Sequence, residues 1–194
     1  MYRAYYNMGY LYQDSGKLDL SIECFRCASR ITPTDVDTHI NLGLALKQKG
    51  NYYDAIKCYQ KAIEYDPNCL MAHFNLGNAY QDVKDYTRAI DCFLHVLRLD
   101  EQHVDALFNL AIAYHDRSIT STDPASPSNQ RSSDLKLALD CYIRVSRLLP
   151  HLEEPKRAAT MIQNLINCTP TSSPSGVTTT STPLSPGTST ITDE

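Results

Sequence analysis

One pattern repeats along the chain every 34 residues, and it constrains the fold more than any other feature. Gly9, Gly43 and Gly77 lie 34 residues apart, and Ala111 follows at the same interval. The flanking residues align as well, reading YNMGYLY, INLGLAL, FNLGNAY and FNLAIAY. Self-similarity at a period of this length is typical of repeat architectures, in which each unit buries its apolar face only against a neighbour. The sequence therefore predicts a solenoid of stacked helix–turn–helix units.

A second segment of each unit keeps the same register. It reads SIECFRCA, AIKCYQKA, AIDCFLHV and, after an insertion, ALDCYIRV, and a proline closes three of the units at Pro33, Pro67 and Pro150. These residues resemble the tetratricopeptide-repeat (TPR) family, whose signature is a bulky residue, then Leu-Gly, Tyr, Ala, an aromatic residue, Ala and Pro at fixed offsets. The resemblance covers roughly residues 2–150. It implies an all-α, right-handed α-solenoid of four repeats.

The chain divides into four repeats, one further helix and a tail. The predicted repeats span residues 2–35, 36–69, 70–103 and 104–152, followed by a capping helix over 153–168 and a disordered tail over 169–194. Ala138 lies 15 residues beyond position 123, where the register places it. The fourth repeat is therefore expected to carry a mobile inserted loop at about 118–133. The tail is rich in Ser, Thr and Pro, and its four Ser/Thr-Pro pairs are either phosphorylation sites or part of an inert solvated segment.

Charge and composition exclude several classes of partner. The formal net charge is −4 and no basic run exists, whereas nucleic acid requires a basic surface. No stretch reaches about 18 apolar residues, so no membrane insertion is expected. The start of the chain lacks the basic and apolar regions of a signal peptide. A cytoplasmic or nuclear location with reduced cysteines is the expectation.

The predicted ligand-binding surface follows from the family resemblance, which implies that the first helix of each unit lines a concave groove. One groove position holds asparagine in every repeat, at Asn7, Asn41, Asn75 and Asn109. The other predicted groove residues are Tyr6, Ile40, Phe74, Phe108, Tyr10, Leu44, Asn78, Ile112 and Lys47. An asparagine amide can pair with both the C=O and the N–H of an extended peptide. The row is similar to the asparagine ladder in the TPR arm of O-GlcNAc transferase, which holds extended substrate segments; the alternative is that these asparagines only stabilise the helix pairs.

The charges predicted for this groove favour a neutral or basic peptide. The basic groove residues are Arg3 and Lys47, and the acidic ones are Asp14, Asp37, Asp82, Asp105 and Asp116. An acidic ligand would be repelled. The carboxylate clamp of Hsp70/Hsp90 co-chaperones needs Lys and Arg at positions that here hold Tyr6, Tyr10, Ile40 or Leu44, so no standard clamp is expected.

No reactive site emerges from the sequence, so we predict a non-enzymatic protein–protein interaction module without cofactor, metal or catalytic residue. Cys24, Cys58, Cys92 and Cys141 recur at one place in each repeat, too far apart for disulfides and better explained by packing. Two alternatives stay open. One is a structural scaffold subunit that docks through its convex face or its uncapped N-terminal helix. The other is a fragment of the TPR arm of a larger enzyme similar to O-GlcNAc transferase.

Overall fold

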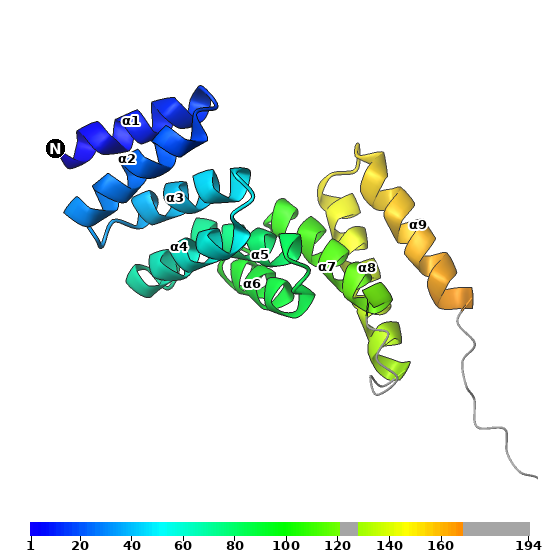
Figure 1. The fold of residues 1–194 in the computed structure, drawn as a ribbon. Helices are drawn as coiled ribbons and strands as arrows, with labels where there is room; N and C mark the ends of the chain where they lie inside the picture. The colour runs from blue at the N-terminus through cyan, green and yellow to red at the C-terminus, as the bar shows by residue number, and fades with distance from the viewer. Residues whose placement is uncertain (121–127, 169–194) are drawn as a thin grey trace, which may run out of the picture.

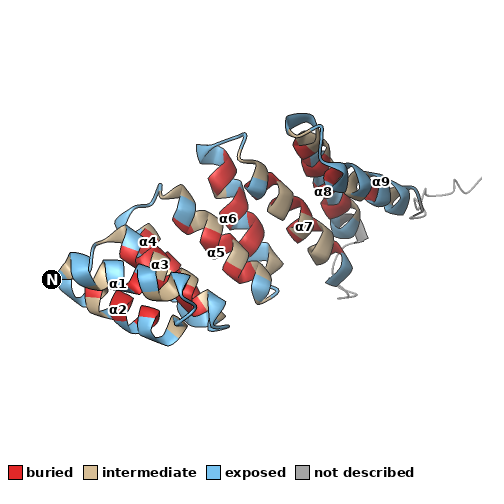
Figure 2. Cartoon of the chain, turned by 90° about the horizontal axis from the view of Figure 1, so that it is seen from above, coloured by how far each residue is buried: buried red, intermediate tan, exposed pale blue. Residues whose placement is uncertain are grey.

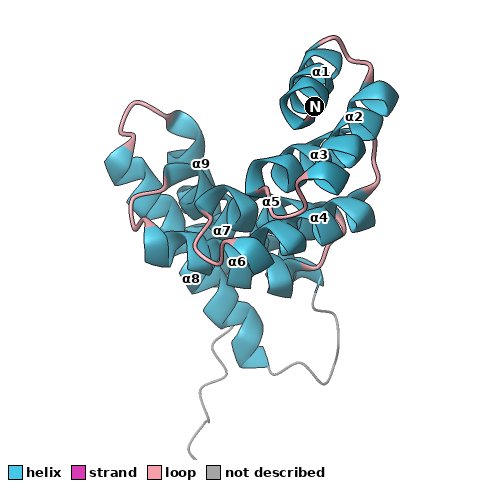
Figure 3. Ribbon diagram, turned by 90° about the vertical axis from the view of Figure 1, so that its left-hand side faces the viewer, coloured by secondary structure: helices cyan, strands magenta, loops and turns pink. Residues whose placement is uncertain are grey.

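The computed structural model describes residues 1–120 and 128–168, which form nine helices and no strand. The helices are α1 (Tyr2–Asp14), α2 (Leu18–Ile31), α3 (Val36–Gln48), α4 (Tyr52–Tyr65), α5 (Leu70–Asp82), α6 (Tyr86–Leu99), α7 (Val104–Thr120), α8 (Ser128–Leu148) and α9 (Glu153–Cys168). Consecutive helices pack against each other along the whole series, so the chain is an open array of hairpins with α1 and α9 at opposite ends (Figure 1). The connections that Figure 3 draws in colour, between one helix and the next, are short loops. The predicted helical solenoid is confirmed.

Each of the first three hairpins closes through a glycine that faces an aromatic ring. A Cβ atom built on Gly9, Gly43 or Gly77 would approach Phe25, Tyr59 or Phe93 to within 2.8, 2.5 and 2.7 Å. These distances are shorter than any normal carbon–carbon contact, so only glycine lets the two helices pack at this separation. The 34-residue glycine spacing in the sequence is thus the spacing of the helix crossings.

The turns inside the first three hairpins share one backbone feature. Gly16 and Gly50 have φ angles of +73° and +84°, a region that glycine adopts without steric cost. The third turn places Lys84 at φ +64°, a conformation that costs a non-glycine residue about 1 kcal/mol. The repeat therefore preserves the turn geometry even where it has lost the glycine.

The core is continuous from α2 to α9 and is formed on the faces where helices meet (Figure 2). Its largest fully buried side chains include Tyr59 and Phe25. Ser21 stands where the repeat has alanine, and its buried hydroxyl donates to the carbonyl of Gly9 at 2.8 Å, which explains how a polar residue fits there.

Tyr59 carries a polar atom that the core does not satisfy. Its Oη atom is buried and has no hydrogen-bond partner among the described residues, whereas the equivalent Phe25 and Phe93 have no hydroxyl. Burial raises the pKa of Tyr59, so the hydroxyl remains neutral.

We expect Tyr59→Phe to raise the free energy of unfolding by about 1 kcal/mol, because it removes an unpaired buried hydroxyl. Urea denaturation checks this, with Tyr80→Phe as the control; the Tyr80 hydroxyl accepts from Gln60 at 3.1 Å, so its loss should bring no gain. A loss of stability in Tyr59→Phe would contradict this account.

The inserted loop predicted at about 118–133 is wrong at both ends. Helix α7 continues to Thr120, and α8 already begins at Ser128, ten residues before Ala138. A buried ion pair explains the extension. Arg117 donates two hydrogen bonds to the fully buried carboxylate of Asp134, at 2.9 and 2.7 Å, and Gln130 donates a third at 2.9 Å. The remaining insertion, 121–127, and the predicted tail, 169–194, lie outside the described residues.

Helix α9 ends the array and packs on α8. Pro155 and Ile162 are buried, whereas most of its other side chains are exposed, and Figure 2 shows this helix mostly in the colour of exposed residues. Leu165 on this helix is 38% exposed. A helix with one buried edge and a polar outer face is what the end of a repeat array requires.

Candidate peptide-binding groove

The first helices of the hairpins form the inner face of the array. Helices α1, α3, α5 and α7 each contact the next one in this series, whereas the second helices pack against the first helices on either side of them rather than against one another. An array whose first helices approach more closely than its second helices must curve toward the first helices. The helices that carry the predicted groove residues therefore lie on the concave side.

The predicted groove residues differ widely in exposure. Asn7 and Tyr10 are exposed, and most of the others are half-buried. The half-buried residues are Tyr6, Asn41, Leu44, Lys47, Phe74, Asn78, Phe108, Asn109 and Ile112. Ile40 is buried in a small cluster with Ala62 and Ala72, so it supports the groove from below rather than lining it. Met71 on α5 is 53% exposed, at the place that Asp37 and Asp105 occupy in the neighbouring repeats.

Two of the four asparagines already donate a side-chain hydrogen bond to the first helix of the preceding repeat. Asn41 donates from Nδ2 to the hydroxyl of Tyr6 at 2.8 Å, and Asn109 donates from Nδ2 to Oδ1 of Asn78 at 2.8 Å. Asn7 is exposed, so water satisfies it. The four amides are therefore not equivalent, although the sequence places asparagine at this position in all four repeats. They differ because the preceding repeat supplies a hydrogen-bond acceptor at only two of the junctions.

Asn75 is the exception among these asparagines. It is only 7% exposed, and its Nδ2 atom is buried without a hydrogen-bond partner in the described part of the chain. The residues of α3 that correspond to Tyr6 and Asn78, the acceptors at the other two junctions, are Ile40 and Leu44. Both are aliphatic and offer no acceptor. A buried amide donor without a partner costs about 1–3 kcal/mol, so Asn75 weakens the folded array as it stands.

The charged groove residues also divide into paired and free groups. Lys47 forms an ion pair with Asp82 at 3.1 Å across the junction between α3 and α5. Gln13 and Gln48 make the equivalent contact one repeat earlier, at 3.1 Å. Asp37 and Asp105 are exposed on the inner face and form no ion pair with a described residue. The groove accordingly keeps its acidic excess after its internal pairs are counted.

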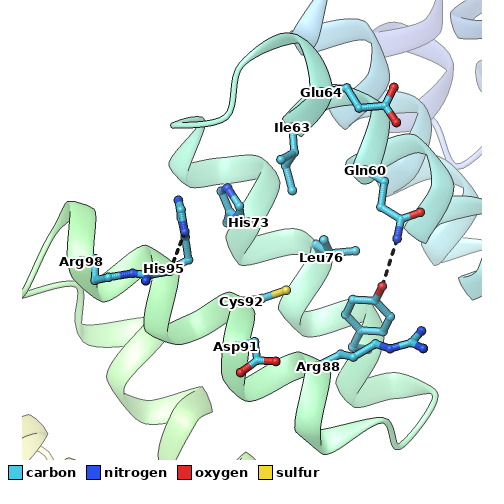
Figure 4. Close-up of a pocket in the computed structure, with 11 residues that line it drawn as sticks. Gln60, Ile63, Glu64, His73, Leu76, Arg88, Asp91, Cys92, His95 and Arg98 are labelled. Atoms are coloured by element: carbon cyan, nitrogen blue, oxygen red, sulfur yellow. Dashed lines mark hydrogen bonds between the residues drawn. The ribbon is translucent and has the colours of Figure 1, made fainter.

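A cavity of about 710 Å³ lies on the other side of α5, between α4 and α6 (Figure 4). His73 and His95 stack there with ring centroids 3.8 Å apart, and Arg98 donates to Nδ1 of His95 at 2.9 Å. Burial, then His73 and Arg98, lower the pKa of His95, so its ring stays neutral. Glu64 of α4 lines this cavity together with Asp91, Arg88 and Arg98 of α6, which leaves no dominant charge to select a ligand.

The thiols of the described repeats are packing groups. The described cysteines are free, and burial raises the pKa of Cys58 and Cys141 to about 11 and that of Cys92 to about 12. Such thiols are protonated at neutral pH and are poor nucleophiles and metal ligands. Among the residues that the structure describes, no cluster of three or more His, Cys, Asp or Glu side chains could hold a metal ion. No helix there is long and apolar enough to cross a membrane.

Family models confirm the nature of the repeat. A model described as tetratricopeptide repeat matches residues 36–69 and 71–103, and one described as TPR repeat matches residues 9–50. The matched segments are tetratricopeptide repeats. Family members of this kind mediate protein–protein interactions, which supports the general prediction of an interaction module. No curated protein sequence matches the chain.

Solved TPR structures share the fold at low sequence identity. The crystal structure of MamA protein is 19% identical and has a TM-score of 0.73, covering 86% of this chain and 84% of that one. The first TPR of Spaghetti (RPAP3) bound to HSP90 peptide SRMEEVD is 21% identical with a TM-score of 0.56, over 68% of this chain and 93% of that one. YrrB, described as a TPR protein with an unusual peptide-binding site, is 21% identical with a TM-score of 0.66, over 82% and 74%. Two of these three TPR structures are thus described as binding peptides.

Proposed function

We propose that the concave groove binds an extended, non-acidic polypeptide segment, and that Asn75 is the central contact. The observation that carries this proposal is the buried amide of Asn75, whose Nδ2 atom has no hydrogen-bond partner among the described residues. At this junction α3, the first helix of the preceding repeat, supplies no acceptor. A folded array gains nothing from such an amide. A bound backbone gives it the hydrogen bonds that it lacks, and rotation about χ2 lets either amide atom face the ligand.

The surroundings of Asn75 suit an extended chain. Leu44 and the exposed Met71 provide apolar surface beside it, and Asn78 lies one helical turn further along α5. Packed helices lie about 8–10 Å apart and an extended chain rises about 3.3 Å per residue, so neighbouring repeats meet every third residue of the ligand. Each hydrogen bond contributes about 1 kcal/mol net, and micromolar affinity is the expectation after the ordering costs.

The charges favour a segment without carboxylates. Asp37 and Asp105 flank Met71 on the inner face, and Lys47 is neutralised by Asp82. A basic side chain on the ligand therefore finds an unpaired carboxylate on either side of the central contact, whereas an acidic ligand finds no free cation near Asn75. This groove differs in that respect from a clamp for an acidic C-terminal peptide.

The test uses peptides selected from a random extended-peptide library on the purified chain, with affinity measured by fluorescence anisotropy. Asn75→Leu keeps the branching of the side chain at Cγ and removes the amide. We expect it to weaken binding about tenfold or more while raising the free energy of unfolding by about 1 kcal/mol, because the unpaired buried amide is gone. Asn7→Leu, the same change in the first repeat, is the matched control and should leave stability nearly unchanged.

Two results would overturn the proposal. If Asn75→Leu binds the selected peptides as tightly as the wild type, the amide is not the contact. If the substitution lowers stability, the asparagine serves the helix pair, as the structural alternative holds. Selection of mainly acidic peptides would contradict the charge preference alone.

A further inference from the structure

The inner face carries a second row of side chains, one helical turn away from the asparagines. We call it the edge row; its members are Asp37, Met71 and Asp105, the second residues of α3, α5 and α7. Asp37 and Asp105 are exposed, and Met71 is 53% exposed. Burial and the charge of Asp37 raise the pKa of Tyr6, so this carboxylate lies near the groove residue of α1.

The edge row and the asparagines form matched pairs along the helices. Each edge residue precedes the asparagine of its own helix by four positions, so the two side chains share one face of that helix. On α5 this pairs the exposed Met71 with Asn75, which is 7% exposed and whose Nδ2 atom has no hydrogen-bond partner among the described residues. A carboxylate in the first turn of a helix also interacts with the helix dipole, but that role does not explain Met71 at the same place.

The spacing of the helices sets the spacing of contacts along a ligand. Helix α3 contacts α5 and α5 contacts α7, and packed helices lie about 8–10 Å apart. A polyproline II helix has three residues per turn and rises about 3.1 Å per residue, so every third side chain recurs on one edge after about 9 Å. Successive side chains of a β-strand point to opposite faces, so residues three apart do not share a face. Of these two extended conformations, polyproline II therefore presents one side chain to each of three neighbouring repeats.

We propose that the groove binds a polyproline II segment with the pattern basic-x-x-apolar-x-x-basic. This inference rests on the proposed function and specifies its ligand. The two basic side chains face Asp37 and Asp105, which form no ion pair with a described residue, and the apolar side chain between them packs on Met71. A polyproline II backbone makes no internal hydrogen bonds, so the backbone of the apolar residue is free to bind Asn75. Arg3 holds the equivalent place on α1, so the row of basic residues ends at Asp37.

Fluorescence anisotropy with synthetic peptides and the 194-residue chain tests the pattern. The probe is Lys-Ala-Pro-Leu-Ala-Pro-Lys with blocked termini, in which each proline and the residue before it favour polyproline II. We expect it to bind in the micromolar range. Its shuffled form, Ala-Pro-Lys-Leu-Lys-Ala-Pro, has the same composition and charge and should bind about tenfold more weakly, because its lysines cannot reach both carboxylates. Replacing both prolines by glycine should also weaken binding about tenfold, since the flexible chain must be ordered on binding.

A charge exchange locates the two basic contacts. Asp37→Lys and Asp105→Lys should each weaken binding of the probe about tenfold. Two further peptides each carry glutamate in place of one lysine. We expect one of them to restore binding to Asp37→Lys and the other to restore binding to Asp105→Lys. Asp54→Lys is the matched control, because Asp54 is an exposed carboxylate in the first turn of the second helix α4, and it should leave binding unchanged.

Circular dichroism confirms that each variant is folded before binding is measured. Equal binding of the probe and its shuffled form overturns the inference, and so does a charge exchange that restores nothing. A probe that fails to bind at about 1 mM also overturns it. The library peptides then distinguish the two proposals: if they lose affinity for Asn75→Leu, the groove binds peptides of another pattern, and if they do not, the proposed function fails as well.

Discussion

Arg117→Ala is expected to lower the free energy of unfolding by about 3–5 kcal/mol, the largest loss of any single substitution considered for this chain. Asp134 is fully buried, and its carboxylate depends on two hydrogen bonds from Arg117 and one from Gln130. Asp134 also raises the pKa of Arg117, so the guanidinium stays charged. Without Arg117 the carboxylate would remain buried beside a single neutral donor.

Urea denaturation followed by circular dichroism measures this effect. Arg88→Ala is the matched control, because Arg88 pairs with Asp85 at 3.4 Å on the surface and its loss should cost less than about 1 kcal/mol. The double variant Arg117→Met/Asp134→Leu should recover most of the stability, since a well-packed apolar pair can replace a buried ion pair. Equal losses in Arg117→Ala and Arg88→Ala would show that the pair does not hold α7 to α8.

Gly43→Ala is expected to lower the free energy of unfolding by about 2 kcal/mol, the second largest loss. The added Cβ would lie 2.5 Å from the Tyr59 ring, which is fully buried and has no room to retreat. Overpacking of this kind costs up to about 3 kcal/mol, and the better helix propensity of alanine returns about 1 kcal/mol.

The fourth repeat supplies the control for Gly43→Ala. Ala111 occupies the same place there and is fully buried, so that helix pair already accommodates a methyl group. Ala111→Gly should cost about 1 kcal/mol, from helix propensity and the lost methyl contact. Stabilisation by Gly43→Ala would mean that the α3–α4 crossing is looser than the structure shows.

The sequence predicted those features that depend on a single unit of the repeat. The glycine spacing marked where helices cross, and the prolines marked where helices end, because each acts through its own backbone or nearest contact. The inserted segment was predicted wrongly for the opposite reason. Its Ser-rich composition indicates a loop, but the Arg117–Asp134 pair forms between residues 17 positions apart and overrides that local preference.

The groove asparagines show the same limit more sharply. The sequence identified all four, yet whether each amide is satisfied depends on one side chain of the preceding repeat. Tyr6 and Asn78 supply acceptors at two junctions, and Ile40 and Leu44 supply none at the third. That difference can be seen only after the helices are placed beside each other. The similarity of the row to the ladder of O-GlcNAc transferase stays a prediction.

The most direct test of the groove proposal is an NMR titration that follows the side-chain amide resonances of the asparagines. A peptide selected on the chain is added to ¹⁵N-labelled protein, with Asn75→Leu used to assign the Asn75 signals. We expect large shifts of the Asn75 amide on binding and small shifts for Asn41 and Asn109, whose amides already donate within the array. Saturable binding that leaves the Asn75 resonances unmoved would contradict the proposal and place the ligand on another surface.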